Sequence, residues 1–197
     1  GVQQRLGIEH FDDNININDL GYQARNNYTQ IRTAHTRTSS NLSWARNNQF
    51  DIRGALQENG DGFFTRGGVF ISNRATFNNL TSVTGRISHF YPGYDDLNSF
   101  GNGVYRIEEK TTVELGFDSN SAKVMSFGVG LGYVEEDLSG DSYYYHANVN
   151  WRPLDGLSVG AGVRYLDRDG WLLHQENRNF TTFSAEQWQP NLNVEYF

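Results

Sequence analysis

Hydrophobic and polar residues alternate along much of the chain, and the alternation is most regular between residues 104 and 165. It predicts four strands, at 104–117, 123–133, 143–152 and 157–165. In the third, for example, Tyr143, Val149 and Trp151 share one parity, while His146 and Asn148 take the other. Successive side chains of a strand point to opposite faces, so each segment predicts one apolar face and one polar or small face.

The same alternation is weaker before residue 104. Residues 42–57 place Leu42, Trp44, Phe50, Ile52 and Leu56 on one parity and Asp51, Arg53 and Gln57 on the other. Arg46 and Asn48 interrupt the apolar parity. Further strands are predicted at 1–9, 28–37, 63–77 and 80–90, although 28–37 is polar on both faces. The chain then holds about ten strands.

The connections between these segments fall into two alternating sets, as in an up-and-down antiparallel meander. One set consists of short turns near 38–41, 78–79, 118–122, 153–156 and 185–187. The other consists of 58–62, 91–102, 135–142 and 167–170, where the sequence DRDG predicts a hairpin turn. Membrane barrels place their longer loops outside the cell, so the set containing the long 91–102 segment is assigned to the outside.

Aromatic residues lie at the ends of the apolar faces. This placement matches the aromatic girdles at the two surfaces of a membrane-spanning barrel. A soluble β-sandwich also alternates, but it does not need aromatic residues at both ends of each strand. The predicted interface aromatics are Tyr105, Phe117, Tyr133, Tyr143, Trp151, Tyr165, Trp188 and Tyr196. The predicted fold class is an all-β, antiparallel up-and-down transmembrane β-barrel, or part of a larger one.

The composition of the chain excludes several classes of protein. The 197 residues suggest one domain, and 14% aromatic residues argue against disorder. The chain has no Cys, so disulfide scaffolds and thiol chemistry are excluded. The net charge of −7 and the scattered basic residues argue against nucleic acid as a partner. No apolar run is long enough for a transmembrane helix.

The polar parity supplies the candidate site. The predicted lumen-lining residues are Arg106, Glu108, Lys110, Glu114, His146, Asn148, Asn150, Arg152 and Arg164. These side chains would select or bind polar solutes, or they would form a salt-bridged ladder that fills the interior. The small residues Gly128, Gly130, Gly132, Gly160 and Gly162 leave room on this face for neighbours such as Tyr144, or leave it empty.

No catalytic or metal site is predicted, and no cofactor. The segment DDNININD (12–19) is faintly similar to the start of a calcium loop, but Ile17 replaces the expected Gly and the final Glu is missing. The five His residues show no close ligand spacing. His146 with a nearby Ser would be an unspecific basis for a hydrolase, so we predict that the protein is not an enzyme.

The segment NINDLGYQARNN (16–27) carries a family resemblance, through Asn18, Asp19, Leu20, Gly21, Arg25, Asn26 and Asn27. It resembles large outer-membrane proteins of Gram-negative bacteria, in which a family-9 carbohydrate-binding-like domain precedes a β-barrel of unknown function. The hairpin NWRPLDGLSVG (150–160) is similar to the C-terminal barrel of that family. The resemblance implies that residues 1–197 are an outer-membrane barrel domain and a C-terminal fragment of a longer chain. It supplies no catalytic residues.

The predicted function is a porin-like channel or transport barrel of the bacterial outer membrane, with a polar lumen of mixed charge. A non-conducting barrel that anchors a periplasmic domain or partner is the first alternative, and a soluble carbohydrate-binding β-sandwich is the second. The implied partners are the lipid bilayer and lipopolysaccharide, the barrel-assembly machinery during biogenesis, and a periplasmic or outer-membrane protein.

The last residues, QPNLNVEYF, bear on the extent of the chain. Leu192, Val194 and Tyr196 continue the apolar parity, whereas Phe197 falls with the polar set. A terminal aromatic of a natural barrel is expected in phase with the outward hydrophobic residues, and a shift of one residue reverses the face. We therefore expect the native chain to continue past Phe197 into at least one more strand.

Overall fold

The computed structural model describes residues 1–14, 26–97, 102–135, 140–176 and 179–196. Every regular element in these ranges is a strand, and they contain no helix long and apolar enough to cross a membrane. The strands are β1 (Val2–Phe11), β2 (Tyr28–Ser40), β3 (Asn47–Asn59), β4 (Phe64–Thr76), β5 (Ser82–Phe90), β6 (Gly93–Asp95), β7 (Tyr105–Ile107), β8 (Lys110–Asp118), β9 (Met125–Glu135), β10 (Asp141–Leu154), β11 (Leu157–Glu176) and β12 (Asn179–Tyr196).

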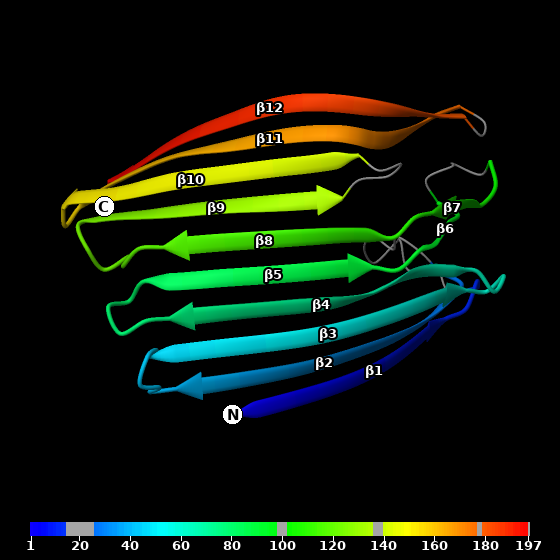
Figure 1. The fold of residues 1–197 in the computed structure, drawn as a ribbon, viewed down its shortest axis with the longest axis horizontal. Coiled ribbons are helices and arrows are strands. Elements are labelled where there is room, and N and C mark those ends of the chain that lie inside the picture. The colour runs from blue at the N-terminus through cyan, green and yellow to red at the C-terminus, as the bar shows by residue number, and fades with distance from the viewer. Residues whose placement is uncertain (15–25, 98–101, 136–139, 177–178, 197) are drawn as a thin grey trace.

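Ten of these strands form one antiparallel sheet in the order β1-β2-β3-β4-β5-β8-β9-β10-β11-β12. Neighbours in the sheet are neighbours in sequence, apart from β5 and β8, between which β6 and β7 form a small sheet of their own (Figure 1). The all-β class and the antiparallel meander are thus confirmed. Over the described residues the outer strands β1 and β12 do not pair with each other, so closure into a barrel stays a prediction.

The two ends of the sheet differ. The end that carries the connections 41–46, 77–81, 119–124 and 155–156 is called the turn end. The opposite end, which carries the connection between β3 and β4 and the β6–β7 insertion, is called the loop end (Figure 1). Val2 pairs with Arg37 and Leu157 with Tyr196, so β1 begins and β12 finishes at the turn end. The turn predicted at 185–187 is wrong, because these residues lie within β12.

Strand register puts the apolar residues of the ten strands on one face. One cross-strand row runs Ile52, Ile71, Ile87, Val113 and Tyr133 through β3, β4, β5, β8 and β9. Most of the face is exposed, and the only apolar residues that are buried in the described part of the chain are Ala45 and Ala75. The sheet is therefore a single layer, with no hydrophobic core between two described layers.

One predicted strand and one predicted turn are wrong, because both depend on which segments of the chain pair. The strand expected over 104–117 is broken at 108–109, and its first part, β7, pairs with β6 instead of β5. The predicted hairpin turn at 167–170 is a bulge inside β11, where Asp169 and Gly170 oppose Ser184 alone and Gly170 has a φ of 74°. Local turn and strand patterns do not reveal which segment a strand pairs with.

The first turn is also displaced from its predicted position. Residues 41–46 form the connection between β2 and β3, so Leu42, Trp44 and Arg46 belong to a turn. The Trp44 ring packs edge-on against Phe77 of the next turn, with ring centroids 6.3 Å apart. The interruption of the apolar parity at Arg46 therefore marks the turn, whereas Asn48 interrupts it at the start of β3, which alternates from Gln49 onward.

Candidate functional site

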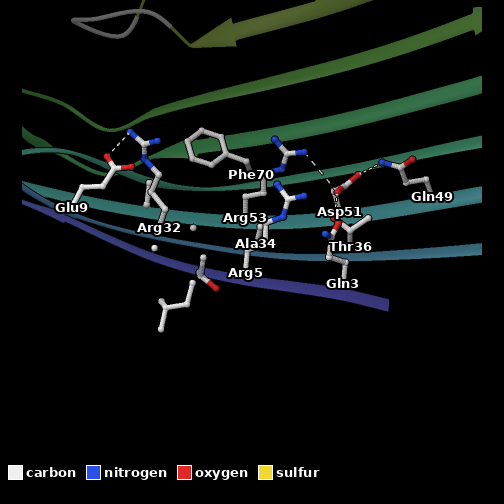
Figure 2. Close-up of a pocket in the computed structure, with 15 residues that line it drawn as sticks. Gln3, Arg5, Glu9, Arg32, Ala34, Thr36, Gln49, Asp51, Arg53 and Phe70 are labelled. Carbon is white, nitrogen blue, oxygen red and sulfur yellow. Dashed lines mark hydrogen bonds and ion pairs between the residues drawn. The ribbon is translucent and has the colours of Figure 1, made fainter. Parts of the chain in front are cut away.

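The polar face is hollowed over β1–β5. One hollow of about 760 Å³ lies over β1–β4, and a second of about 550 Å³ lies over β3–β5. Both are within the size range of small-molecule sites. The charged residues of the first hollow are Arg5, Glu9, Arg32, Asp51 and Arg53, and the second adds Arg74 and Arg86. Figure 2 shows Arg32, Arg53 and Phe70 on the same side of the strands.

Asp51 is the fixed centre that the two hollows share. Its side chain accepts hydrogen bonds from the Thr36 hydroxyl and from Gln49 Nε2, the second at 2.8 Å, and Arg53 Nη2 lies 3.7 Å from Asp51 Oδ1 (Figure 2). Asp51 is only 6% exposed. A buried carboxylate needs such donors to offset its lost hydration, so this acid is bound to the scaffold and is not presented to a solute.

Unlike the buried Asp51, the arginines of the hollows that form ion pairs have exposed side chains. Arg32 lies 3.5 Å from Glu9, Arg74 3.5 Å from Asp118, and Arg86 3.2 Å from Glu114. The side chains of Arg32, Arg53, Arg74 and Arg86 are all more than half exposed. The Arg32 and Arg86 pairs link neighbouring strands, and the Arg74–Asp118 pair extends from β4 past β5 to β8. All three leave guanidinium donors facing the hollows.

A polar network continues across the middle of the same face. Ser72, Arg86, Glu114, Gly132 and Tyr144 lie in one cross-strand row from β4 to β10. The Tyr144 ring and hydroxyl extend over Gly132 of β9. The Arg164 guanidinium stacks over the Tyr144 ring, 5.7 Å from its centroid. The Arg86–Glu114 ion pair lies in the same row, at the edge of the second hollow.

The glycines of β9 make that reach possible. A Cβ atom at Gly132 would overlap the Tyr144 ring, and one at Gly130 would overlap the His146 ring. At Gly128 it would lie 2.7 Å from Asn148 Oδ1. The space predicted above these glycines is thus filled by the β10 side chains that pair with them. Over β9 and β10 the polar face is covered, whereas over β1–β5 it is hollow.

Six predicted lumen residues lie on the polar face: Lys110, Glu114, His146, Asn148, Asn150 and Arg164. Arg106 lies in β7 of the small sheet and Glu108 in the break that follows it. Arg152 lies where the β10 register shifts, and its guanidinium donates to the Ser121 carbonyl in the adjacent turn. The structure therefore does not bring Arg106, Glu108 and Arg152 together with the other six.

Most of the predicted interface aromatics lie on the apolar face. Tyr133 contacts Tyr143 near the loop end, with centroids 5.5 Å apart, and Tyr165 contacts Trp188 at 4.6 Å near the middle of β11 and β12. Toward the turn end lie Phe117, Trp151 and Tyr196. Tyr105 is not part of this face, because it lies in β7.

The β6–β7 insertion connects distant strands at the loop end. The Tyr105 ring lies 4.5 Å from the Phe180 ring of β12, and its hydroxyl donates to Asp95 of β6 at 3.1 Å. On the other side Asn59 of β3 donates to Asp96 at 2.8 Å. The insertion therefore contacts both β3 and β12, which lie seven strands apart in the order of the sheet.

The calcium-like segment 12–19 is described only at Asp12, Asp13 and Asn14. The Asn14 backbone N–H donates to Asp12 at 2.9 Å, and this bond is the largest of the effects that lower the pKa of Asp12 to about 2. The arrangement is a local turn. Across the described ranges, no group of three or more acidic or His residues could hold a metal ion.

Sequence patterns missed the two hollows. Five strands each contribute one of the arginines that line them, at positions 5, 32, 53, 74 and 86. Each occupies the polar parity of its own strand, which is a weak pattern in this part of the chain. Only the strand register places them beside one another, and the repeated Arg on the polar parity was the pattern that could have indicated them.

Comparison with known proteins identifies a family for this chain. A family model described as a domain of unknown function (DUF5916) matches residues 2–196. No curated protein matches the chain, and no solved structure does. The match does not test the resemblance to proteins with a carbohydrate-binding-like domain, which stays a prediction.

Proposed function

Since the chain belongs to the DUF5916 family, whose description assigns no function, we propose a function from the two faces of its sheet. The sheet is part of the wall of an outer-membrane β-barrel, with lipid against the apolar face. The polar face lines an aqueous passage for polar solutes. One observation carries the proposal: a broad apolar face is exposed while the opposite face holds the ion pairs and the hollows.

The aromatic residues support lipid as the occupant of the apolar face. On β10, Tyr143 and Trp151 are eight residues apart, or roughly 26 Å at about 3.3 Å per residue before any tilt is allowed for. Barrels carry an apolar band about 25 Å tall between aromatic girdles. Between these two residues the outward side chains of β10 are Tyr145, Ala147 and Val149, and none is charged. The band is less uniform on β2 and β4, where His35, Arg37 and Asn73 interrupt it.

A non-conducting scaffold is the second candidate, and the covered polar face of β9 and β10 favours it. If Tyr144, His146 and Asn148 fill the interior there, the barrel would anchor a periplasmic domain or partner without a passage. In both candidates the chain is a bacterial outer-membrane protein. It would contact lipopolysaccharide and require the barrel-assembly machinery, and it would have no enzymatic activity.

The test uses the whole protein refolded into phospholipid vesicles. Single-tryptophan variants that retain Trp188 should be quenched strongly by brominated lipid, because Trp188 lies on the apolar face. A variant whose only tryptophan is introduced by Asn193→Trp, on the polar face of the same strand, should be quenched much less. Equal quenching in the two variants would contradict lipid as the occupant of one face.

Planar bilayers then separate the two candidates. A channel gives discrete conductance steps, and a folded, membrane-inserted protein that never conducts would leave only the scaffold. Recovery of the native protein in the aqueous phase without detergent would contradict both, and would favour the soluble β-sandwich with a second layer over the apolar face.

A further inference from the structure

We propose that the polar face of β1–β5 is a binding site for small organic anions that carry a carboxylate or phosphate group. The inference rests on the proposed function and deepens it, because it names the class of solute that the passage would take. It starts from the five arginines of the two hollows: Arg5, Arg32, Arg53, Arg74 and Arg86.

The charge of the hollows opposes the charge of the chain. The whole protein carries a net charge of −7, yet the two hollows together are lined by five Arg and two acids, Glu9 and Asp51. Asp51 is buried and held by two hydrogen bonds and by Arg53, while Asp118 and Glu114 pair with Arg74 and Arg86 from beside the hollows. A solute in the hollows therefore meets more guanidinium groups than carboxylates, which attracts and concentrates anions.

The arginines keep donors for a ligand. Each ion pair of Arg32, Arg53, Arg74 and Arg86 involves one guanidinium nitrogen at 3.2–3.7 Å from a carboxylate oxygen. In the pairs of Arg32, Arg74 and Arg86 both side chains are exposed, and such pairs contribute about 0–1 kcal/mol, so an anion can compete for these guanidinium groups. Arg5 has no ion pair or hydrogen bond within the described part of the chain. A planar guanidinium binds carboxylate and phosphate through two parallel hydrogen bonds.

Phe70 adds an apolar surface to both hollows. Its strand register places it directly opposite Arg53 on β3 and Ser88 on β5. A ligand with an anionic group and an apolar ring would place the anion on Arg5 and Arg53 and the ring on Phe70. That combination predicts a preference for organic over inorganic anions.

The distribution of charge along the sheet favours approach from the turn end. Acidic residues gather at the loop end, among them Asp61, Glu109, Glu135 and Asp141. The turns at the other end carry Arg46, Lys123 and one acid, Asp155, and Arg152 lies beside them near the end of β10. An anion would therefore meet less repulsion at the turn end than at the loop end.

The experiment is equilibrium binding to the whole protein in detergent micelles, measured by titration calorimetry. The probes are phthalate and phenyl phosphate, with benzyl alcohol as a neutral ring. Both anions should bind and benzyl alcohol should not. Arg5→Gln and Arg53→Gln should each weaken binding about tenfold, since a hydrogen bond to a charged group is lost. Phthalate binding alone would identify carboxylates as the ligand class, and phenyl phosphate binding alone would identify phosphates.

Arg37→Gln is the matched control, because it removes the same charge from the apolar face and should bind like the wild type. Arg5→Gln removes no ion pair, so it tests the site even if Arg53→Gln fails to fold. Unchanged affinity in Arg5→Gln, or equal binding of benzyl alcohol, would overturn the site.

Reversal potentials in planar bilayers separate this inference from the proposed function. A channel that prefers cations would overturn the anion site and leave the passage intact. A protein that binds both anions but never conducts would overturn the passage and keep the site.

Discussion

Val129→Arg is expected to lower the free energy of unfolding from phospholipid vesicles by about 2–4 kcal/mol, the cost of Arg near the midplane of a barrel wall. Val129 lies on the apolar face of β9, between Phe117 and Ala147 in its cross-strand row. Its row lies between those of Tyr145 and Trp151, and its side chain is 45% exposed. A lipid environment would therefore surround the introduced charge.

The measurement is urea unfolding in vesicles, followed by the loss of protection from protease. Asn193→Arg is the control, because it adds the same side chain to the polar face, where Gly160 opposite leaves space. Its free energy of unfolding should stay within about 0.5 kcal/mol of wild type. If Val129→Arg costs no more than this control, the apolar face does not contact lipid.

Strand positions and faces were predictable because side-chain direction has a period of two in any strand. The parity assigned to Tyr143 and Trp151, and that assigned to Leu192 and Val194, is the one the register gives them. Even 28–37, polar on both faces, is part of β2. The parity of a residue depends only on its position along its own strand, so a strand can be predicted even where its apolar face is weakly marked.

Pairing was not predictable, because it depends on residues far apart in sequence. Tyr105 and Ile107 share the parity of Val113, with Glu109 and Thr111 between them, yet β7 leaves the large sheet. The contacts of Tyr105 with Asp95 and Phe180 accompany that departure. In the same way, the positive φ that Gly170 permits allows either a hairpin turn or a bulge. Its pairing partner decides between them.

The candidate site was also predictable only where it depends on parity and not on strand pairing. Glu114 and Arg164 were predicted on the polar face from parity alone. The hollow beside Asp51 was not, because it needs β1, β2 and β3 aligned in register to bring Arg5 next to Arg53. The sequence-based set therefore lies mainly on the filled half of the polar face, and the hollows lie on the other half.

Gly132→Ala is expected to destabilise the folded protein by about 2 kcal/mol, within the range for overpacking. The new methyl group would occupy the space of the Tyr144 ring. Tyr144 would have to turn away, losing its stacking with Arg164. Urea unfolding in vesicles measures the change.

Two further variants show whether the Tyr144 ring causes the loss of stability. Gly160→Ala, where the nearest atoms to a Cβ are 4.0 Å away, should be neutral or stabilising by about 0.5–1 kcal/mol, because Ala loses less backbone entropy than Gly. In a Tyr144→Ala background, Gly132→Ala should behave like Gly160→Ala, since the obstructing ring is gone. Equal losses from Gly132→Ala with and without Tyr144 would show that the glycine serves the strand backbone, and that the network from Arg86 to Arg164 does not depend on it.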